Sequence, residues 1–115
     1  MIPRLTSTEE VTRLMSIGRN NRNVRTAGYR ERLERLPQHI QMLAAAAFEV
    51  FLADPEDPAL HNHALDDTRR GRHRKESRAV WITRRYRAIY VVDGDVNVWY
   101  WVGSHSDYNI FTDRK

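Results

Sequence analysis

A histidine and a phenol near the C-terminal end of the chain are the side chains best placed by type and spacing for proton transfer. His105 and Tyr108 lie in the segment 103–108 (GSHSDY), directly after an apolar stretch that is typical of a strand. Histidine gives or takes a proton readily near neutral pH, and loops that follow strands often display reactive groups. A Ser-His-Ser loop alone is more typical of a turn, so these two residues become candidates only beside nearby cations.

Arg87 is such a cation, because it lies inside the otherwise apolar run RRYRAIY at residues 84–90. A buried guanidinium without a partner is costly. We therefore expect Arg87 to meet a carboxylate, to reach the open face of a sheet or to bind a ligand phosphate. An ion pair with Asp107 or Glu76 is the structural alternative. The neighbouring Arg78, Arg84 and Arg85 favour a ligand, since they would repel Arg87 if no anion were bound.

The basic residues of the chain are concentrated in one segment. Of the 19 Lys and Arg residues, nine fall within residues 69–87, where Glu76 is the only acid. Clustered cations gain affinity for a polyanion by displacing the counterions around its phosphates, and arginine matches phosphate better than lysine does. Codon bias explains scattered arginines such as Arg4, but explains this cluster less well. The cluster consists of Arg69, Arg70, Arg72, Arg74, Lys75, Arg78, Arg84, Arg85 and Arg87.

His61 and His63 form a second histidine group before the strands. Two histidines at positions i and i+2 can bind a metal from an extended segment, but no third ligand has a recognisable spacing. We interpret the group as a loop that supplies a proton-transferring or base-contacting histidine, and predict neither a metal nor a cofactor. His73, within the arginine run, is expected on the basic surface. Trp81 and other aromatic residues of the strands could stack on unpaired bases, although most are expected in the core.

The composition indicates one compact domain. The 115 residues are 41% apolar and 30% charged, without cysteine, and no apolar run approaches the length of a membrane span. The absence of cysteine excludes disulfides, thiolate metal sites and cysteine nucleophiles. The N-terminus lacks the pattern of a secretion signal. We expect a cytoplasmic protein that does not associate with membranes.

The apolar spacing predicts helices first and strands afterwards. A capping box at Ser7 predicts a short helix over residues 8–17, and residues 24–27 are compatible with a short strand. Apolar residues at spacings of three and four predict helical segments over residues 29–36 and 37–53, interrupted by Pro37, which form a helical hairpin or one kinked helix. Strands are predicted over residues 79–83, 86–92 and 96–102, with a two-residue turn at Asp93-Gly94. Alternation in the last strand would place Trp99 and Trp101 on one face. The expected fold is α+β, with a helical hairpin packed on a small twisted antiparallel sheet and a short extra N-terminal helix.

The stretch from Tyr29 to Phe111 resembles the RelE/ParE superfamily of bacterial toxins. The matching pieces are YRERLERLP at residues 29–37, HNHAL at 61–65, YRAIY at 86–90 and WVGSHSDY at 101–108. The resemblance implies a ribosome-dependent endoribonuclease that cuts messenger RNA by attack of a ribose 2′-hydroxyl on the adjacent phosphate. It also implies silencing by an antitoxin, for which the basic surface suggests an acidic, partly disordered segment.

The resemblance assigns roles residue by residue. Arg87 would bind the scissile phosphate and Arg78 would supply a second cation. His105 would act as acid or base, and Tyr108 would orient the nucleotide or share the proton transfer. His63 matches a histidine that some members carry before the strands. The remaining basic residues would contact RNA of the message or the ribosome, namely Arg69, Arg70, Arg72, Arg74, Lys75, Arg84 and Arg85.

The chain departs from the family pattern in two segments. Residues 1–22 precede the usual start of the domain and are predicted as an extension, with the toxin domain at 23–115. The segment 66–76 is longer and more basic than the usual connection.

Two alternatives to the ribonuclease function stay open. Members of the ParE branch inhibit DNA gyrase without catalysis, and a protein of this fold can be an inactive RNA-binding module. His105 with Tyr108 favours the ribonuclease branch.

Overall fold

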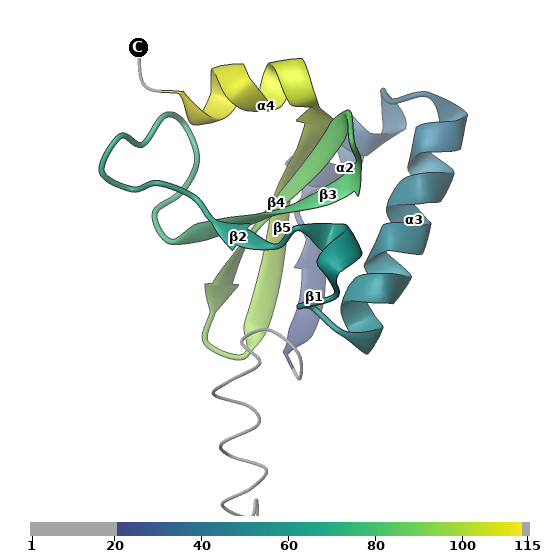
Figure 1. Cartoon of the computed structure of the whole chain (residues 1–115), viewed down its shortest axis with the longest axis horizontal. Helices are drawn as coiled ribbons and strands as arrows, with labels where there is room; N and C mark the ends of the chain where they lie inside the picture. Colours follow the sequence, from purple (N-terminus) through teal and green to yellow (C-terminus); the bar gives the residue numbers. More distant parts are fainter. Residues whose placement is uncertain (1–20, 114–115) are drawn as a thin grey trace, which may run out of the picture.

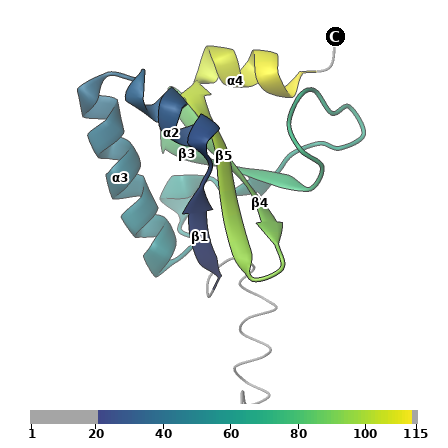
Figure 2. The ribbon, with the colours of Figure 1, turned by 180° about the vertical axis from the view of Figure 1, so that it is seen from behind.

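A computed structural model describes residues 21–113 of the chain, so the helix predicted over residues 8–17 lies outside the described residues. Figures 1 and 2 show one sheet with helices on both sides and a long connection between β2 and β3. No helix within the described range is long and apolar enough to cross a membrane. In chain order the elements are β1 (Arg22–Arg25), α2 (Ala27–Glu34), α3 (Gln38–Ala53), the 3-10 helix η1 (Pro58–Leu60), β2 (His63–Ala64), β3 (Ser77–Thr83), β4 (Tyr86–Asp93), β5 (Val96–Ser104) and α4 (His105–Thr112).

The sheet has five strands in the order β1-β5-β4-β3-β2. Strands β2 to β5 form an antiparallel meander, whereas β1 lies parallel to β5. The chain leaves β1 through α2 and α3 and returns to it only with its last strand, and a connection of this length permits parallel pairing. The strand expected at residues 24–27 is therefore present, two residues earlier, and it makes the sheet mixed.

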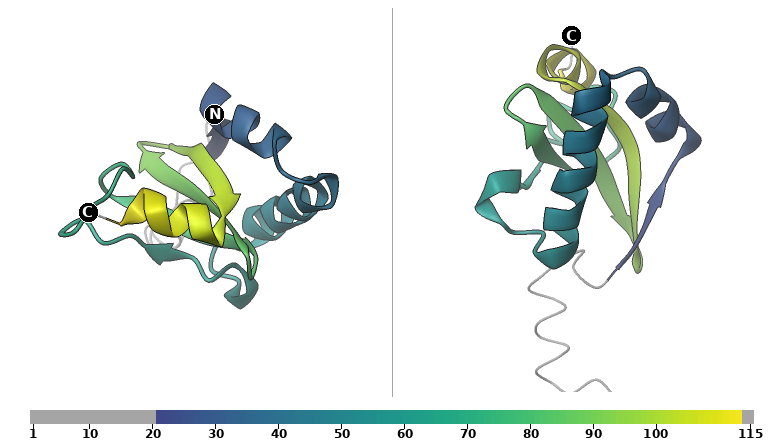
Figure 3. Two further views of the ribbon diagram at one scale, coloured as in Figure 1. Left: turned by 90° about the horizontal axis from the view of Figure 1, so that it is seen from above. Right: turned by 90° about the vertical axis from the view of Figure 1, so that its right-hand side faces the viewer.

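The predicted helical hairpin is confirmed. Thr26 caps α2, since its side-chain oxygen accepts a hydrogen bond from the Tyr29 backbone N–H at 3.0 Å. Pro37 stands directly before α3, where its missing N–H costs nothing. Helix α3 runs along one face of the sheet, as the two views of Figure 3 show.

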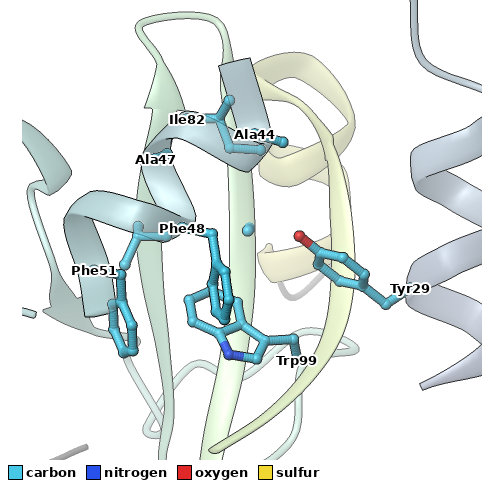
Figure 4. Close-up of a pocket in the computed structure, with 9 residues that line it drawn as sticks. Tyr29, Ala44, Ala47, Phe48, Phe51, Ile82 and Trp99 are labelled. Atoms are coloured by element: carbon cyan, nitrogen blue, oxygen red, sulfur yellow. The ribbon is translucent and has the colours of Figure 1, made fainter. Parts of the chain in front are cut away.

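An aromatic cluster joins α3 to this face of the sheet. Trp99 of β5 lies edge-on to Phe51, with ring centroids 4.9 Å apart, and Phe51 lies edge-on to Tyr90 at 5.3 Å. The apolar recess between Tyr29, Phe48 and Trp99 is shown in Figure 4. Its volume of about 10 Å³ admits no more than one water molecule. This recess belongs to the core and is not a ligand site.

A bulge in β5 reverses part of the expected alternation. Ile89 pairs with Trp101 and Tyr90 pairs with Trp99, so Tyr100 is the extra residue. The prediction that Trp99 and Trp101 share a face is therefore wrong. Trp99 packs in the cluster beneath α3, and Trp101 packs on the other face with Tyr108 and Phe111 of α4.

The turn between β4 and β5 is displaced by one residue from its predicted place. Asp93 and Val96 are paired as the last residues of the strands, so Gly94 and Asp95 form the two-residue loop. Gly94 has φ +60°, which a residue without Cβ adopts freely. Glycine at the first loop position is typical of a type II′ turn, which suits a twisted hairpin as well as the expected type does.

Candidate catalytic site

Arg87 lies at the centre of the face of the sheet that α4 partly covers. It pairs with Trp81 of β3 on one side and with Gly103 of β5 on the other. Its guanidinium carbon is 4.2 Å from the centre of the Trp81 ring, and only 6% of the residue is exposed. A cation above an indole is attracted by the negative ring face. The apolar strand thus holds a buried charge on an aromatic surface.

The hydrogen bonds of Arg87 differ from the alternatives considered from sequence. Its Nη1 donates to the carbonyl oxygens of Thr83 and Arg84, each at 2.9 Å, and of Tyr86 at 3.2 Å. Neither Asp107 nor Glu76 pairs with it, and no other carboxylate of residues 21–113 does. The carbonyls of the preceding turn therefore take the place of the ion pair that was the structural alternative to a ligand. Burial lowers the pKa of Arg87, an effect opposed by the Tyr108 phenol.

The rest of the guanidinium faces an open cleft. Nε and Nη2 make no hydrogen bond within the part of the chain that the structure describes. The cleft is lined by Trp81, Arg84, Arg85, Arg87 and His105. Arg84 and Arg85 form the β3–β4 turn and are exposed, so three guanidinium groups border one hollow. Such a site suits an anion with several oxygens, as a phosphate has.

His63 and Tyr108 form a hydrogen-bonded pair on the face of the sheet that carries Arg87. His63 Nε2 is 3.3 Å from the Tyr108 hydroxyl, and His63 Nδ1 is 2.7 Å from the His61 carbonyl oxygen. A carbonyl only accepts, so Nδ1 carries a proton, and in the neutral ring Nε2 is the acceptor. Burial raises the pKa of Tyr108, which the Arg87 charge opposes. The phenol therefore keeps its proton near neutral pH and donates it towards His63.

His105 is the first residue of a helix, and its prediction as a loop residue is wrong. Ser104 caps α4 by accepting a hydrogen bond from the Asp107 N–H at 3.1 Å. The His105 N–H donates to the Arg85 carbonyl oxygen at 2.6 Å, which ties α4 to the β3–β4 turn. The His105 ring is exposed, lies 6.3 Å from the Tyr108 ring and borders the Arg87 cleft. The missed signal is the Ser-x-x-Asp capping pattern at residues 104–107.

Arg78 is not part of this group. It pairs with Tyr90, which lies on the face covered by α3, whereas Arg87 and Trp81 lie on the opposite face. Its Nε donates to the Asn62 side-chain oxygen at 2.9 Å, and Asn62 in turn donates to the Tyr90 hydroxyl at 2.9 Å. The second cation expected from Arg78 is thus engaged elsewhere, and Arg84 and Arg85 stand at the cleft instead.

The basic segment predicted to contact RNA folds back against α4. The Arg72 N–H donates to the Phe111 carbonyl oxygen at 2.7 Å, and the Arg74 N–H donates to the Tyr100 hydroxyl at 2.7 Å. His73 is buried at 2% exposure, so its expected place on the basic surface is wrong. The side chains of the predicted contact residues are exposed, namely Arg69, Arg70, Arg72, Arg74, Lys75, Arg84 and Arg85.

The sequence matches no protein-family model and no curated protein. Solved structures are similar to it, at low identity. YafQ from Escherichia coli strain BL21(DE3) is 12% identical with a TM-score of 0.55, over 76% of this chain and 97% of that one. A metal-bound toxin from Helicobacter pylori is 14% identical with a TM-score of 0.54 over the same shares. The E. coli DinJ–YafQ complex contains a chain that is 11% identical, with a TM-score of 0.54, 76% of this chain and 96% of that chain being covered.

The similarity extends over most of the described residues and nearly the whole of each matched chain. It agrees with the architecture derived above, in which a helical hairpin covers one face of a small sheet and a short C-terminal helix lies on the other. At these identities a shared structure establishes the fold alone. The chain has the RelE-like fold of the bacterial toxins that its sequence resembles.

Proposed function

We propose that the protein is the toxin of a toxin–antitoxin pair and that it cleaves messenger RNA on the ribosome. The observation that carries the proposal is a cleft lined by Arg87 and His105, with the hydrogen-bonded pair of His63 and Tyr108 on the same face of the sheet. Cleavage by a ribose 2′-hydroxyl needs a base for that hydroxyl, an acid for the leaving oxygen and cations around the phosphate. This one face of the sheet brings all three kinds of group together.

His63, alone or together with Tyr108, supplies the general base of the proposed reaction. The His61 carbonyl holds the Nδ1 proton, so the free Nε2 lone pair of His63 points towards the phenol. In the proposed step His63 takes the proton of the 2′-hydroxyl, directly or through Tyr108, and the oxygen attacks the neighbouring phosphorus. His105, which borders the cleft, acts as the general acid and gives a proton to the departing 5′-oxygen. The products are a 2′,3′-cyclic phosphate and a 5′-hydroxyl end.

Arg87 stabilises the charge that develops on the phosphate. Its Nη1 is fixed by the turn carbonyls, so Nε and Nη2 are preoriented towards the cleft. A donor that needs no reorganisation during the reaction is worth more than a mobile one. Arg84 and Arg85 add positive potential at the rim. Arg78, held by Asn62 on the other face, has no part in this step.

The exposed cations beyond the cleft are proposed to contact RNA of the message and ribosome. The segment 66–76 and the β3–β4 turn carry them, so the basic surface continues outwards from the cleft. The partner DinJ of YafQ supports an antitoxin for this chain as well. The antitoxin of this protein is proposed to contain an acidic, partly disordered segment that neutralises the basic surface.

Purified ribosomes programmed with a defined message test the proposal. We expect the wild type to cut the message in the decoding site, and His63→Ala and His105→Ala to lose about 10²-fold or more in single-turnover rate. His39→Ala, an exposed histidine on α3, is the matched control and retains full activity. An intact message with the wild type, together with inhibition of gyrase supercoiling, would assign the protein to the gyrase inhibitors. Salt-sensitive binding without cleavage would assign it to inactive RNA-binding modules.

A further inference from the structure

A row of side chains crosses the sheet at the level of Arg87. Gly103, Arg87 and Trp81 are consecutive partners on β5, β4 and β3. His63 of β2 pairs with Ala79, so the antiparallel register brings His61, two residues earlier, to the level of Trp81. The His61 and Trp81 rings are stacked, with centroids 3.7 Å apart and planes at 22°. The row therefore continues to the edge of the sheet and ends in His61.

Trp81 is held between its two neighbours. The Arg87 guanidinium carbon lies 4.2 Å from the centre of the indole, nearly as close as the His61 ring. Two groups at such distances would overlap on one face of a ring, so they occupy opposite faces. The phosphate-binding cleft lies on the Arg87 side, and His61 forms the outer layer of the stack.

The backbone holds His61 in this place. The residue has φ 47° and ψ 42°, a left-handed conformation that is uncommon outside glycine and typical of functional sites. Its N–H donates to the Pro58 carbonyl oxygen at 3.2 Å, and its carbonyl accepts from His63 Nδ1. The preceding turn η1 is anchored by Leu60, which is 2% exposed. His61 is therefore fixed although its side chain is exposed.

The outer face of the His61 ring is open to solvent. The residue is exposed while Trp81 covers one face of the ring, so the exposed area belongs to the other face and the ring edge. Trp81 is half-buried, unlike Trp99 and Trp101, which are 3% and 2% exposed. Packing of the core does not require this stack. A rigid, exposed ring beside a cationic cleft is what a protein offers to an unpaired base.

We propose that the outer face of His61 is a nucleobase subsite, on which the base of a nucleotide that flanks the scissile phosphate stacks. The proposal rests on the proposed function, because it assigns a substrate contact within the same site. The His61 ring centre is 3.7 Å from the Trp81 ring centre, and the Arg87 guanidinium carbon is 4.2 Å from it. The distance between His61 and the guanidinium cannot exceed the sum of these two distances, so a base on His61 lies near a phosphate at Arg87. Every base has a π-face, so the subsite binds any base. It favours purines, because their larger rings have more area to stack.

Binding to ribosomes programmed with a message that cannot be cut tests this subsite. The cleavage position is first mapped with the wild type, and the nucleotide there is then replaced by its 2′-deoxy form, which lacks the attacking hydroxyl. Further messages carry an abasic site on one or the other side of that position. The Kd of each is measured for the wild type, His61→Ala, His61→Phe and the control His39→Ala.

We expect an abasic site at the stacked nucleotide to weaken wild-type binding roughly fivefold to a hundredfold, the range reported for one base on an aromatic side chain. His61→Ala should lose a similar factor on the intact message and little more on the abasic one. His61→Phe keeps the flat ring and should bind within about threefold of the wild type, since stacking needs no particular base.

The wild type alone can refute the proposal, so the test does not depend on the folding of any variant. If neither abasic site weakens wild-type binding while the cleavable message is still cut, the subsite is absent and the proposed function stands. If His61→Ala is as sensitive to the abasic site as the wild type, the base stacks elsewhere. If His61→Phe binds as weakly as His61→Ala, the contact is polar and not a stack. Failure of the wild type both to bind and to cut would remove the proposed function, and the subsite with it.

Discussion

Replacing Arg87 separates its role in the β3–β4 turn from its proposed role at the phosphate. Arg87→Lys keeps a positive charge on a flexible stem, whereas Arg87→Met keeps only the apolar length. The guanidinium fixes the turn through Nη1 and leaves Nε and Nη2 for a ligand. A lysine ammonium reaches a turn carbonyl or a phosphate as a single point charge, and cannot hold both in a fixed geometry.

The structural contribution of Arg87 is limited in size. One Nη1 carries two protons, so no more than two of its three carbonyl contacts are full hydrogen bonds at once. Each charge-assisted bond contributes about 1.5 kcal/mol at the lower end of its range, which applies because the turn carbonyls can be rehydrated. The contact with Trp81 adds about 1 kcal/mol. Arg87→Met should therefore lose about 4 kcal/mol in free energy of unfolding, and Arg87→Lys about 1–2 kcal/mol.

For Arg87→Lys, we expect the loss of catalytic rate to correspond to more free energy than the loss of folding stability. Loss of one preoriented donor at a developing charge costs about 10²- to 10³-fold in rate. A protein with about 5 kcal/mol of stability that loses 2 kcal/mol is still about 99% folded, so instability cannot cause such a fall. Urea unfolding and single-turnover cleavage on programmed ribosomes measure the two effects. An Arg87→Lys variant that is destabilised but cleaves at the wild-type rate would refute the assignment of Arg87 to the phosphate.

Three further predictions concern single side chains. Tyr108→Phe removes the hydroxyl 3.3 Å from His63 Nε2, so it should lower the unfolding free energy by at most about 1 kcal/mol but slow single-turnover cleavage about 10²-fold. Gly103→Ala should lower the unfolding free energy in urea by about 1–3 kcal/mol, because its methyl would lie 2.8 Å from a ring carbon of Trp101. Burial raises the pKa of Tyr29 from 10.0 to about 12, so above pH 10 the phenol ionises in the unfolded chain first. Wild-type stability should fall between pH 10 and 12 by up to about 2.7 kcal/mol more than that of Tyr29→Phe in urea titrations at each pH.

Matched controls and opposite results distinguish these predictions from general damage. Gly28→Ala introduces its methyl 3.8 Å from the nearest atom, the Thr26 side-chain oxygen, and should stabilise helix α2 by about 0.5–1 kcal/mol. Equal losses for Gly28→Ala and Gly103→Ala would contradict the close contact at Gly103. Parallel pH profiles for the wild type and Tyr29→Phe would contradict the burial of an un-ionised phenol.

Local patterns predicted the elements well where each has its own signal. Pro37 and the apolar spacing around it mark the helical hairpin, and the chain between residues 77 and 104 has the β-rich runs of a meander. The bulge at Tyr100 has no such signal, because it depends on which residue of β4 faces which residue of β5. Alternation alone therefore assigned Trp99 and Trp101 to one face.

The residue types of the candidate site could be selected from the sequence, but their arrangement in space could not. Arg87 and Tyr108 could be chosen because a cation in a strand and a phenol after it are unusual in type. That Arg78 lies on the other face follows from the irregular register between Trp81 and Thr83, which no local pattern indicates. The stack of His61 on Trp81 depends on a left-handed residue that the sequence does not mark with glycine or asparagine.

The most direct test of the central claim is to map the RNA 5′ ends that appear in cells on expression from a tight promoter. The account predicts growth arrest with new 5′-hydroxyl ends within translated codons, since attack by a 2′-hydroxyl releases that end. His63→Ala and His105→Ala should lose both, and His39→Ala should lose neither. Growth arrest with intact messages, or new ends that persist in both site variants, would contradict the account.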